Sequence, residues 1–140
     1  LFSSSSTLTF LESISEEKAN YRYLPDKWST KQVVGHITDH ERIKMFRAFQ
    51  LSRNEVVELW GYDQSFLVDN ARFEELKMEQ LIVDFLSVRK ASLSFINTLS
   101  ERQLKIKGEA RQYQITLEEL LKSIIGHERH HLNIIKERYL

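Results

Sequence analysis

A complete helix start is encoded by residues 28–33, which read Trp-Ser-Thr-Lys-Gln-Val. Ser29 and Gln32 form a capping box, because the Ser29 hydroxyl accepts from the backbone N–H three residues on while the Gln32 side chain reaches back to the cap. Trp28 and Val33 occupy the flanking positions of a hydrophobic staple. The stretch therefore predicts a long helix that begins near residue 30 and continues to about residue 50.

The same arrangement recurs near the end of the chain, where Thr116 and Glu119 form a second capping box between the apolar residues Ile115 and Leu120. A second long helix should therefore run from about residue 117 to near the C-terminus. Neither segment contains proline, and each spans ~20 residues, or ~30 Å at the α-helical rise. Such lengths are typical of helical bundles.

A third long helix is predicted between residues 76 and 99, and a shorter helix should precede it at about 66–75. A further helix should begin within residues 8–14, extend irregularly to Tyr23 and end before Pro25. The third helix is indicated by apolar residues that recur every three or four positions, namely Met78, Leu81, Ile82, Phe85, Val88, Leu93, Phe95 and Ile96.

Together these segments predict an all-α fold, an antiparallel up-down four-helix bundle with a short extra helix. The connections at about residues 51–65 and 100–115 are long for a bundle, in which ~2–8 residues are usual, and long loops often carry function. Aromatic residues at helical spacing are expected in the core, namely Phe46, Phe49, Phe85 and Phe95.

Composition limits the function classes. The 140 residues fit a single domain over residues 1–140, and 20 Lys and Arg balance 20 Asp and Glu. A neutral chain lacks the basic field that nucleic-acid binding usually needs. The mean hydropathy is −0.40, and the apolar runs are far shorter than the ~18 residues of a membrane span. We therefore expect neither nucleic acid nor a membrane as a partner.

Cysteine is absent, which excludes disulfides and thiolate metal sites. The opening residues lack the basic segment of an export signal. Both observations are compatible with the cytoplasm, which is the location that we expect.

Five histidines lie on the two capped helices, namely His36, His40, His127, His130 and His131. Residues four apart share a helix face, so His36 pairs with His40 and His127 pairs with His131. Both pairs continue an apolar stripe that should face the bundle interior. There, an imidazole without a partner costs about 1–3 kcal/mol. A divalent metal removes this cost by taking the lone pairs of neutral imidazoles, and a site of three histidines keeps positions open for water or substrate.

Two of the four glycines, Gly35 and Gly126, lie inside the predicted helices and directly precede His36 and His127. Each should cost about 1 kcal/mol relative to alanine. Since a missing side chain lets another helix or a ligand approach the backbone, we expect the two segments to meet.

The sequence resembles the DinB/YfiT-like family of metalloenzymes, which are four-helix bundles, over nearly the whole chain. The resemblance implies a divalent metal, typically nickel or zinc, held by His36, His127 and His131. It is carried by Lys27-Trp28-Ser29, Gly35-His36-Ile37 with Asp39 and Glu41-Arg42, Gly61-Tyr62-Asp63, Ile115-Thr116, and the run from Gly126 to Ile135 that contains His127-Glu128-Arg129-His130-His131.

Two further residues are candidates for catalysis. The chain departs from the family pattern at His40, where relatives usually carry a small residue such as threonine, so His40 is either a fourth ligand or part of the surrounding pocket and water network. Asp63 either orients a metal-bound water from its long loop or is an ordinary turn residue.

The resemblance also implies a function. Characterised relatives include thiol S-transferases that use low-molecular-weight thiols such as bacillithiol, and a thiol-dependent isomerase. We therefore expect metal-dependent thiol transfer to a small-molecule substrate, in a homodimer, since relatives commonly pair through bundle faces. The alternatives are a metal-dependent hydrolase and a non-catalytic helical interaction protein with a structural metal.

Residues 127–131 also match the H-E-x-x-H motif of zinc proteases. Too little sequence follows for the extended motif, and no strand pattern precedes it, so we do not interpret the chain as a protease. Glu128 is expected beside the ligands or at the surface, and His130 at the surface or in a subunit contact. The basic residues Arg102, Lys105, Lys107 and Arg111 are expected to form a solvated face, with a site for an anionic thiol as the alternative.

Overall fold

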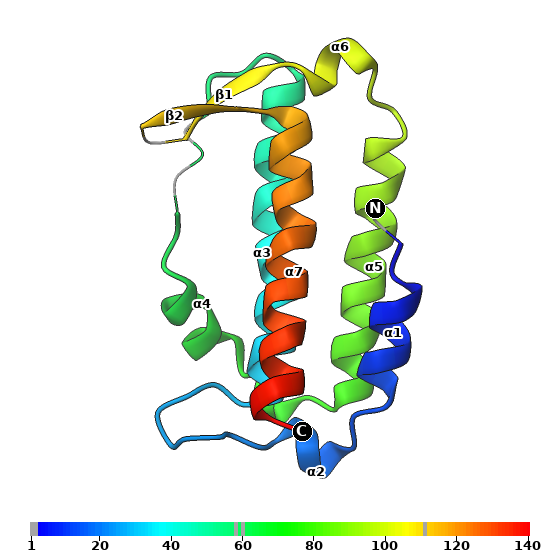
Figure 1. Ribbon diagram of the computed structural model, residues 1–140, viewed down its shortest axis with the longest axis vertical. Helices are drawn as coiled ribbons and strands as arrows, with labels where there is room; N and C mark the ends of the chain where they lie inside the picture. The colour runs from blue at the N-terminus through cyan, green and yellow to red at the C-terminus, as the bar shows by residue number, and fades with distance from the viewer. Residues whose placement is uncertain (1–2, 58, 60, 111) are drawn as a thin grey trace.

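Three long helices dominate the computed structural model, which describes residues 3–57, 59, 61–110 and 112–140 (Figure 1). They are α3 (Thr30–Ser52), α5 (Met78–Ile96) and α7 (Leu117–Arg138). The shorter elements are α1 (Ser5–Glu12), α2 (Glu16–Ala19), α4 (Gln64–Ala71), the 3-10 helix η1 (Phe73–Glu75), α6 (Glu101–Leu104), β1 (Lys107–Ala110) and β2 (Tyr113–Thr116). The all-α class and the four-helix bundle are confirmed, with α1, α3, α5 and α7 as its helices. None of the helices in the described ranges has the length and apolar character that crossing a bilayer requires.

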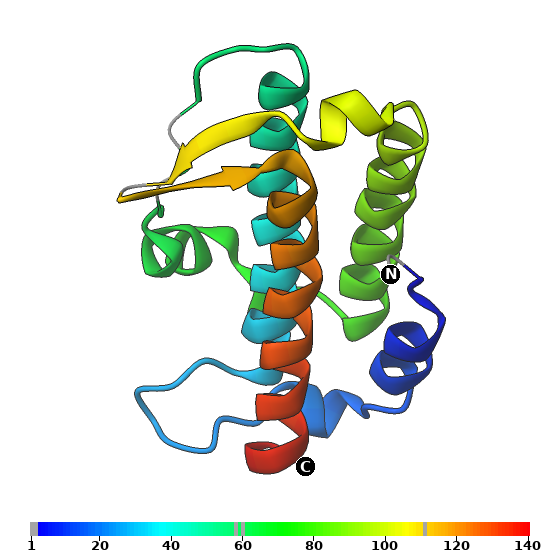
Figure 2. The same cartoon turned by 45° about the horizontal axis from the view of Figure 1, so that its top comes forward.

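The long helices do not alternate in direction along the chain, as the expected up-down order requires. α3 is antiparallel to α7, so that the Tyr139 hydroxyl after α7 donates to the Trp28 carbonyl before α3 at 2.7 Å. α3 is parallel to α5, with Arg42 paired to Asp84 (Figures 1 and 2). Two successive long helices can be parallel here because the intervening chain returns along the bundle through α4 and η1. This return segment lies on the side of α3 that carries the histidines.

Both predicted capping boxes are confirmed. The Ser29 hydroxyl accepts from the Gln32 N–H at 3.2 Å, and the Thr116 hydroxyl accepts from the Glu119 N–H at 3.1 Å. The first helix differs from expectation, because it ends at Glu12 and α2 begins separately. Ser15 caps α2 by accepting from the backbone N–H three residues on, a competing use of the serine side chain that favours a new helix start over continuation.

The predicted loop at 100–115 instead holds α6 and a β-hairpin. β1 and β2 pair antiparallel, with Gly108 opposite Ile115. Gly108 and Ala110 are buried, and an added Cβ at Gly108 would lie 2.8 Å from Leu59. The hairpin thus closes one end of the bundle over a small cluster of apolar side chains, which no helical periodicity could reveal.

The core has two apolar parts separated by a polar layer. The lower core contains Leu11, Val34, Leu81, Phe85 and Ile135, and the upper core contains Leu51, Leu59, Leu117, Leu120 and Ile124. Between them lie buried charged side chains from three helices, Glu41, Arg89 and Glu128.

The aromatic expectation holds only in part. Phe85 is buried and Phe95 is partly buried against the upper core, but Phe46 and Phe49 are 60% and 43% exposed, so the assignment of these two to the core is wrong. Helical spacing shows that residues share one face of a helix, but it does not show whether another element packs against that face. Phe46 and Phe49 border a groove of about 520 Å³ between α3 and α5.

The two helical glycines have different surroundings. An added Cβ at Gly35 would lie 2.5 Å from the ring of Phe73, whereas one at Gly126 would meet nothing within 4 Å. The expectation of close approach therefore holds at Gly35, where the neighbour is the return segment, and is wrong at Gly126. The two glycine-histidine segments meet through their histidines instead.

This contrast makes a prediction. Gly35→Ala should lower the free energy of unfolding by about 1–3 kcal/mol, because the buried Phe73 must move. Gly126→Ala should raise it by up to about 1 kcal/mol through helix propensity alone. Urea unfolding of the two variants checks this, and equal effects of the two substitutions would contradict it.

Candidate metal centre

Three histidine side chains converge between α3 and α7. The Nε2 atom of His127 lies 3.0 Å from Nε2 of His36 and 3.1 Å from Nε2 of His131. The potential ligand atoms of the three residues all lie within 4.8 Å of one another. The one-turn spacing of His127 and His131 on α7 and the antiparallel contact with α3 produce this arrangement. The structure therefore brings together the three residues that the sequence singled out.

The donor set fits a divalent metal ion. A neutral imidazole has one N–H and one lone pair, so three facing Nε2 atoms cannot all be satisfied by one another. The buried Nδ1 atom of His127 has no hydrogen-bond partner among the described residues. An ion that accepts all three Nε2 lone pairs would give each of these atoms a partner. Three imidazole ligands suit zinc, nickel, copper or iron.

Electrostatics keep these imidazoles neutral. Burial, with a contribution from neighbouring histidines, lowers the pKa of His36 to about 4, of His127 to about 2 and of His131 to about 4. All three side chains therefore offer lone pairs at neutral pH, which is the form that binds metal.

His40 lies against the triad without joining it. Its ring stacks on that of His127, with centroids 3.6 Å apart and an interplanar angle of 15°. Its Nδ1 lies 2.9 Å from the Tyr62 hydroxyl. Burial and nearby Asp39 raise the pKa of Tyr62 to about 12, so the hydroxyl that is hydrogen-bonded to Nδ1 keeps its proton at neutral pH. Of the two roles open for His40, the geometry matches a pocket residue beside the ligands.

Asp63 forms a hydrogen bond within its own segment of the chain. Its carboxylate accepts from the Phe66 N–H at 3.0 Å and caps α4, and the side chain is exposed. The catalytic role of Asp63 stays a prediction. The neighbouring Tyr62, which the sequence analysis passed over as a site residue, is the one whose side chain reaches the histidines.

A buried ion-pair cluster lies directly behind the centre. Arg89 of α5 binds both Glu41 of α3 and Glu128 of α7. Ser92 donates to Glu41 at 2.7 Å, and Thr7 donates to Glu128 at 2.9 Å. Glu128 is therefore an interior carboxylate, and the expectation of a surface position is wrong.

The cluster and the centre share two backbone segments. His40 is followed by Glu41, and His127 by Glu128, so each carboxylate of the cluster lies about 100° around its helix from the neighbouring imidazole. Arg89 thus ties the two histidine-bearing helices together from the interior side. The sequence carries a signal for it, since Arg89 continues the apolar stripe of Met78, Leu81 and Phe85.

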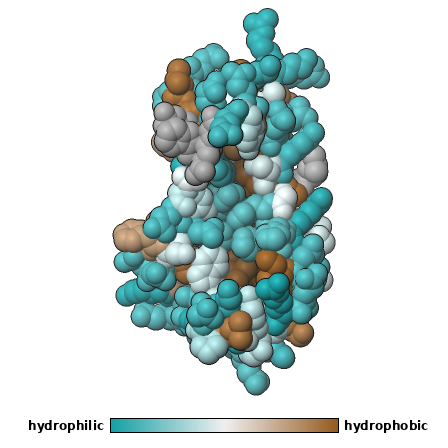
Figure 3. Space-filling model, turned by 60° about the vertical axis from the view of Figure 1, so that its left-hand side comes forward, coloured by the Kyte–Doolittle hydropathy of each residue, from teal (hydrophilic) through white to brown (hydrophobic). Residues whose placement is uncertain are grey.

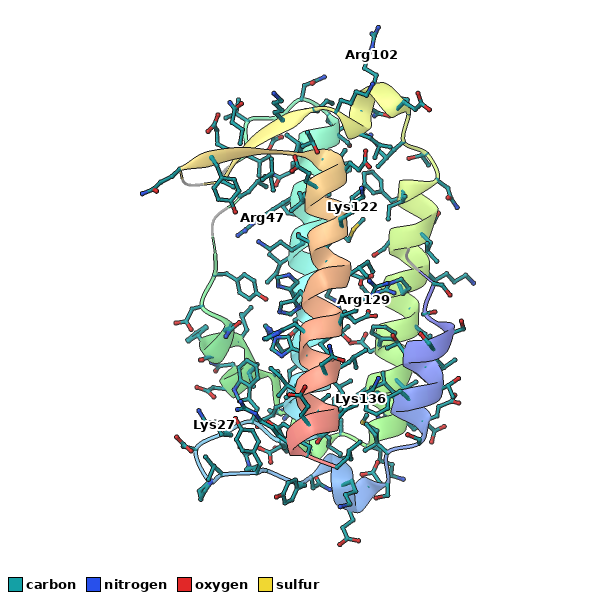
Figure 4. All side chains as sticks on the ribbon, in the orientation of Figure 1. Lys27, Arg47, Arg102, Lys122, Arg129 and Lys136 are labelled. Carbon is teal, nitrogen blue, oxygen red and sulfur yellow. The ribbon has the colours of Figure 1, made fainter. Side chains whose placement is uncertain are left out.

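The remaining sequence expectations concern surface residues. His130 is exposed, and its ring centroid lies 5.2 Å from that of His131. Arg102, Lys105 and Lys107 are exposed, and Figure 4 shows Arg102 pointing away from the end of the bundle. A solvated face is confirmed for these three, while Arg111 lies outside the described residues.

The surface on the side of α4 is hollowed. Figure 3 looks at the side on which α4 lies and shows a recess between α4 and the hairpin. A cavity of about 240 Å³ reaches His131 from the region of α4 and the loop before α3. The centre therefore has space for a small molecule beside it.

Comparison with known proteins agrees with this architecture. A family model described as the DinB superfamily matches residues 3–135. The structure of YfiT from Bacillus subtilis, described as a probable metal-dependent hydrolase with an unusual four-helix bundle topology, is similar to the chain with a TM-score of 0.81 and 20% identity, over 94% of this chain and 77% of that one. None of the curated proteins matches. At this identity, the structural likeness shows the fold alone.

Proposed function

The chain belongs to the DinB superfamily, and on that premise we propose that it is a divalent-metal-dependent enzyme that transfers a low-molecular-weight thiol to an electrophilic small molecule. The observation that carries the proposal is the convergence of three neutral imidazoles on one point. Nickel or zinc is the ion that we propose, held by His36, His127 and His131. When bound, such an ion acts as a Lewis acid and lowers the pKa of a coordinated nucleophile.

The protein's own groups prepare the site. We propose His40 as a catalytic group in the tautomer whose Nδ1 accepts from the Tyr62 hydroxyl and whose Nε2 carries the proton, since Nδ1 and this hydroxyl lie 2.9 Å apart. That proton is then available for a hydrogen bond to the substrate. The stacking of His40 on His127 holds both rings in place. Thiols stay reduced in the cytosol, so we propose a cytoplasmic location.

Thiol binding tests the proposal directly. Cobalt(II)-loaded protein should develop a sulfur-to-cobalt charge-transfer absorption on addition of 2-mercaptoethanol, saturating at one thiol per chain. His130→Ala should keep this band, and His127→Ala should lose it together with the metal. Absence of the band while cobalt is verifiably bound would contradict thiol transfer.

That negative result would favour hydrolysis, the second candidate function. It is supported by the likeness to YfiT, whose description names a metal-dependent hydrolase. Hydrolysis would require the same three histidines. The cobalt experiment therefore separates the two reactions, and either outcome leaves the three histidines as the proposed metal ligands.

We also propose that the protein is a homodimer. The exposed Phe46 lines both the α3–α5 groove of about 520 Å³ and a second hollow of about 510 Å³ on α3. A two-fold interface uses the same patch on both subunits, so in the proposed dimer the Phe46 ring of each protomer enters the groove of the other. Sedimentation should show a dimer that Phe46→Ser converts to a monomer, and a monomeric wild-type protein at micromolar concentration would contradict the proposal.

A further inference from the structure

A cavity borders the candidate metal centre on the side of His131. It has a volume of about 240 Å³ and is walled by Tyr23, Trp28, Ile134 and Tyr139, and we call it the Trp28 cavity. Ile134 lies one turn beyond His131 on α7, so the cavity and the ligand share one face of that helix.

The centre and the cavity also share a ring contact. The ring of Trp28 lies with its centroid 4.9 Å from that of His36. A molecule in the cavity therefore lies next to His131 and next to Trp28, whose ring contacts His36.

The walls are held in place before any ligand arrives. The Tyr139 hydroxyl donates to the Trp28 carbonyl at 2.7 Å, and the Arg138 guanidinium donates to the Tyr23 hydroxyl at 3.1 Å. The rings of Tyr23 and Tyr139 meet edge to face at 5.0 Å. A preformed pocket binds without the entropic cost of ordering its side chains, so these walls can receive a ligand with little rearrangement.

Three aromatic walls favour an aromatic ring as occupant, because edge-to-face and offset stacking add to the burial of apolar area. The volume accommodates a single ring with a short substituent. It does not suit a large hydrophobic chain.

Charge around the cavity selects further. Lys27 belongs to its lining, as does Asp26, and Lys27 lies on the loop beside α4 (Figure 4). Arg138 covers the face of the Tyr23 ring, with its guanidinium carbon 5.4 Å from the centroid. Arg22 is paired with Glu74. The lining itself carries one cation, Lys27, and one carboxylate, Asp26, and Arg138 adds a second cation at the Tyr23 wall, so a cationic occupant is disfavoured.

We infer that the Trp28 cavity binds an aromatic ring without positive charge, which is the specificity-determining part of the substrate whose reacting atom lies at the centre. Its relation to a substrate rests on the proposed function, whereas binding of the ring is a property of the cavity alone. The substrate class is thus a small aromatic compound that is neutral or anionic.

Metal-free protein allows the cavity to be tested apart from the centre. In a Trp60→Phe background the remaining indole N–H signal in a proton–nitrogen NMR spectrum belongs to Trp28. Titration with benzyl alcohol should shift this signal in a saturable manner. Benzylammonium, of the same shape, should bind at least tenfold more weakly.

Two matched variants complete the test. Ile134→Phe fills the cavity and should weaken benzyl alcohol binding at least tenfold. Ile82→Phe makes the same change at another partly buried isoleucine of the lower core, away from the cavity, and should change binding less than twofold.

The inference is overturned if the Trp28 signal does not respond to benzyl alcohol, if Ile134→Phe binds it as well as Ile82→Phe does, or if benzylammonium binds equally well. Metal binding by the same proteins is measured separately. A wild-type protein that binds no metal would contradict the proposed function, while the NMR titration would still show whether the cavity binds an aromatic ring.

Discussion

Arg89→Met should lower the free energy of unfolding by about 3–5 kcal/mol, the usual cost of removing one partner from a buried ion pair. The side chain of Arg89 is 1% exposed, and Glu41 and Glu128 depend on it for their countercharge. Methionine fills much of the space but leaves two carboxylates facing each other in the interior. Urea unfolding at neutral pH measures the loss.

Arg42→Met is the matched control. Arg42 also binds two carboxylates, Asp39 and Asp84, but its side chain is 47% exposed. Exposed ion pairs contribute about 0–1 kcal/mol, so the control should remain close to wild type. An Arg89→Met protein as stable as Arg42→Met would show that the buried cluster does not hold the three helices together.

Acidification of the metal-free protein should cause the second large effect. In the unfolded chain a histidine titrates at about 6.5, whereas burial lowers the pKa of His36 to about 4 in the folded protein. Below pH 6.5 the unfolded state therefore binds more protons than the folded state. Stability that is fully present above pH 6.5 should fall as the pH decreases toward 4.

His36 alone should account for about 2–3 kcal/mol of this loss at pH 4.5, because one pKa unit corresponds to 1.36 kcal/mol. Chemical unfolding of metal-free protein at a series of pH values measures it. His36→Gln should reduce the loss of stability by this amount, and His130→Gln, at an exposed position, should leave it unchanged. A wild-type stability that is constant from pH 6.5 to 4.5 would contradict the burial of neutral imidazoles.

Local sequence signals predicted much of this fold. The capping boxes at Ser29 and Thr116 depend on residues only three apart, so both helix starts could be placed from the sequence. The triad could be found because one-turn spacing places His127 and His131 on one face, and the resemblance supplied His36 as their partner.

Features that depend on tertiary neighbours were missed. The parallel direction of α3 and α5 is decided by the path of the return segment, whose apolar residues are too few to show a period. The contact of Tyr62 with His40 joins a loop to a helix. The exposure of Phe46 depends on what packs against α3. None of these follows from a periodicity within one segment.

The central claim is that His36, His127 and His131 hold one divalent ion. It is tested most directly by elemental analysis with X-ray absorption spectroscopy on protein reconstituted with nickel or zinc. We predict one ion per chain with three imidazole ligands in the wild type and in His130→Ala, and none in His127→Ala. A stoichiometric ion in His127→Ala would contradict the assignment.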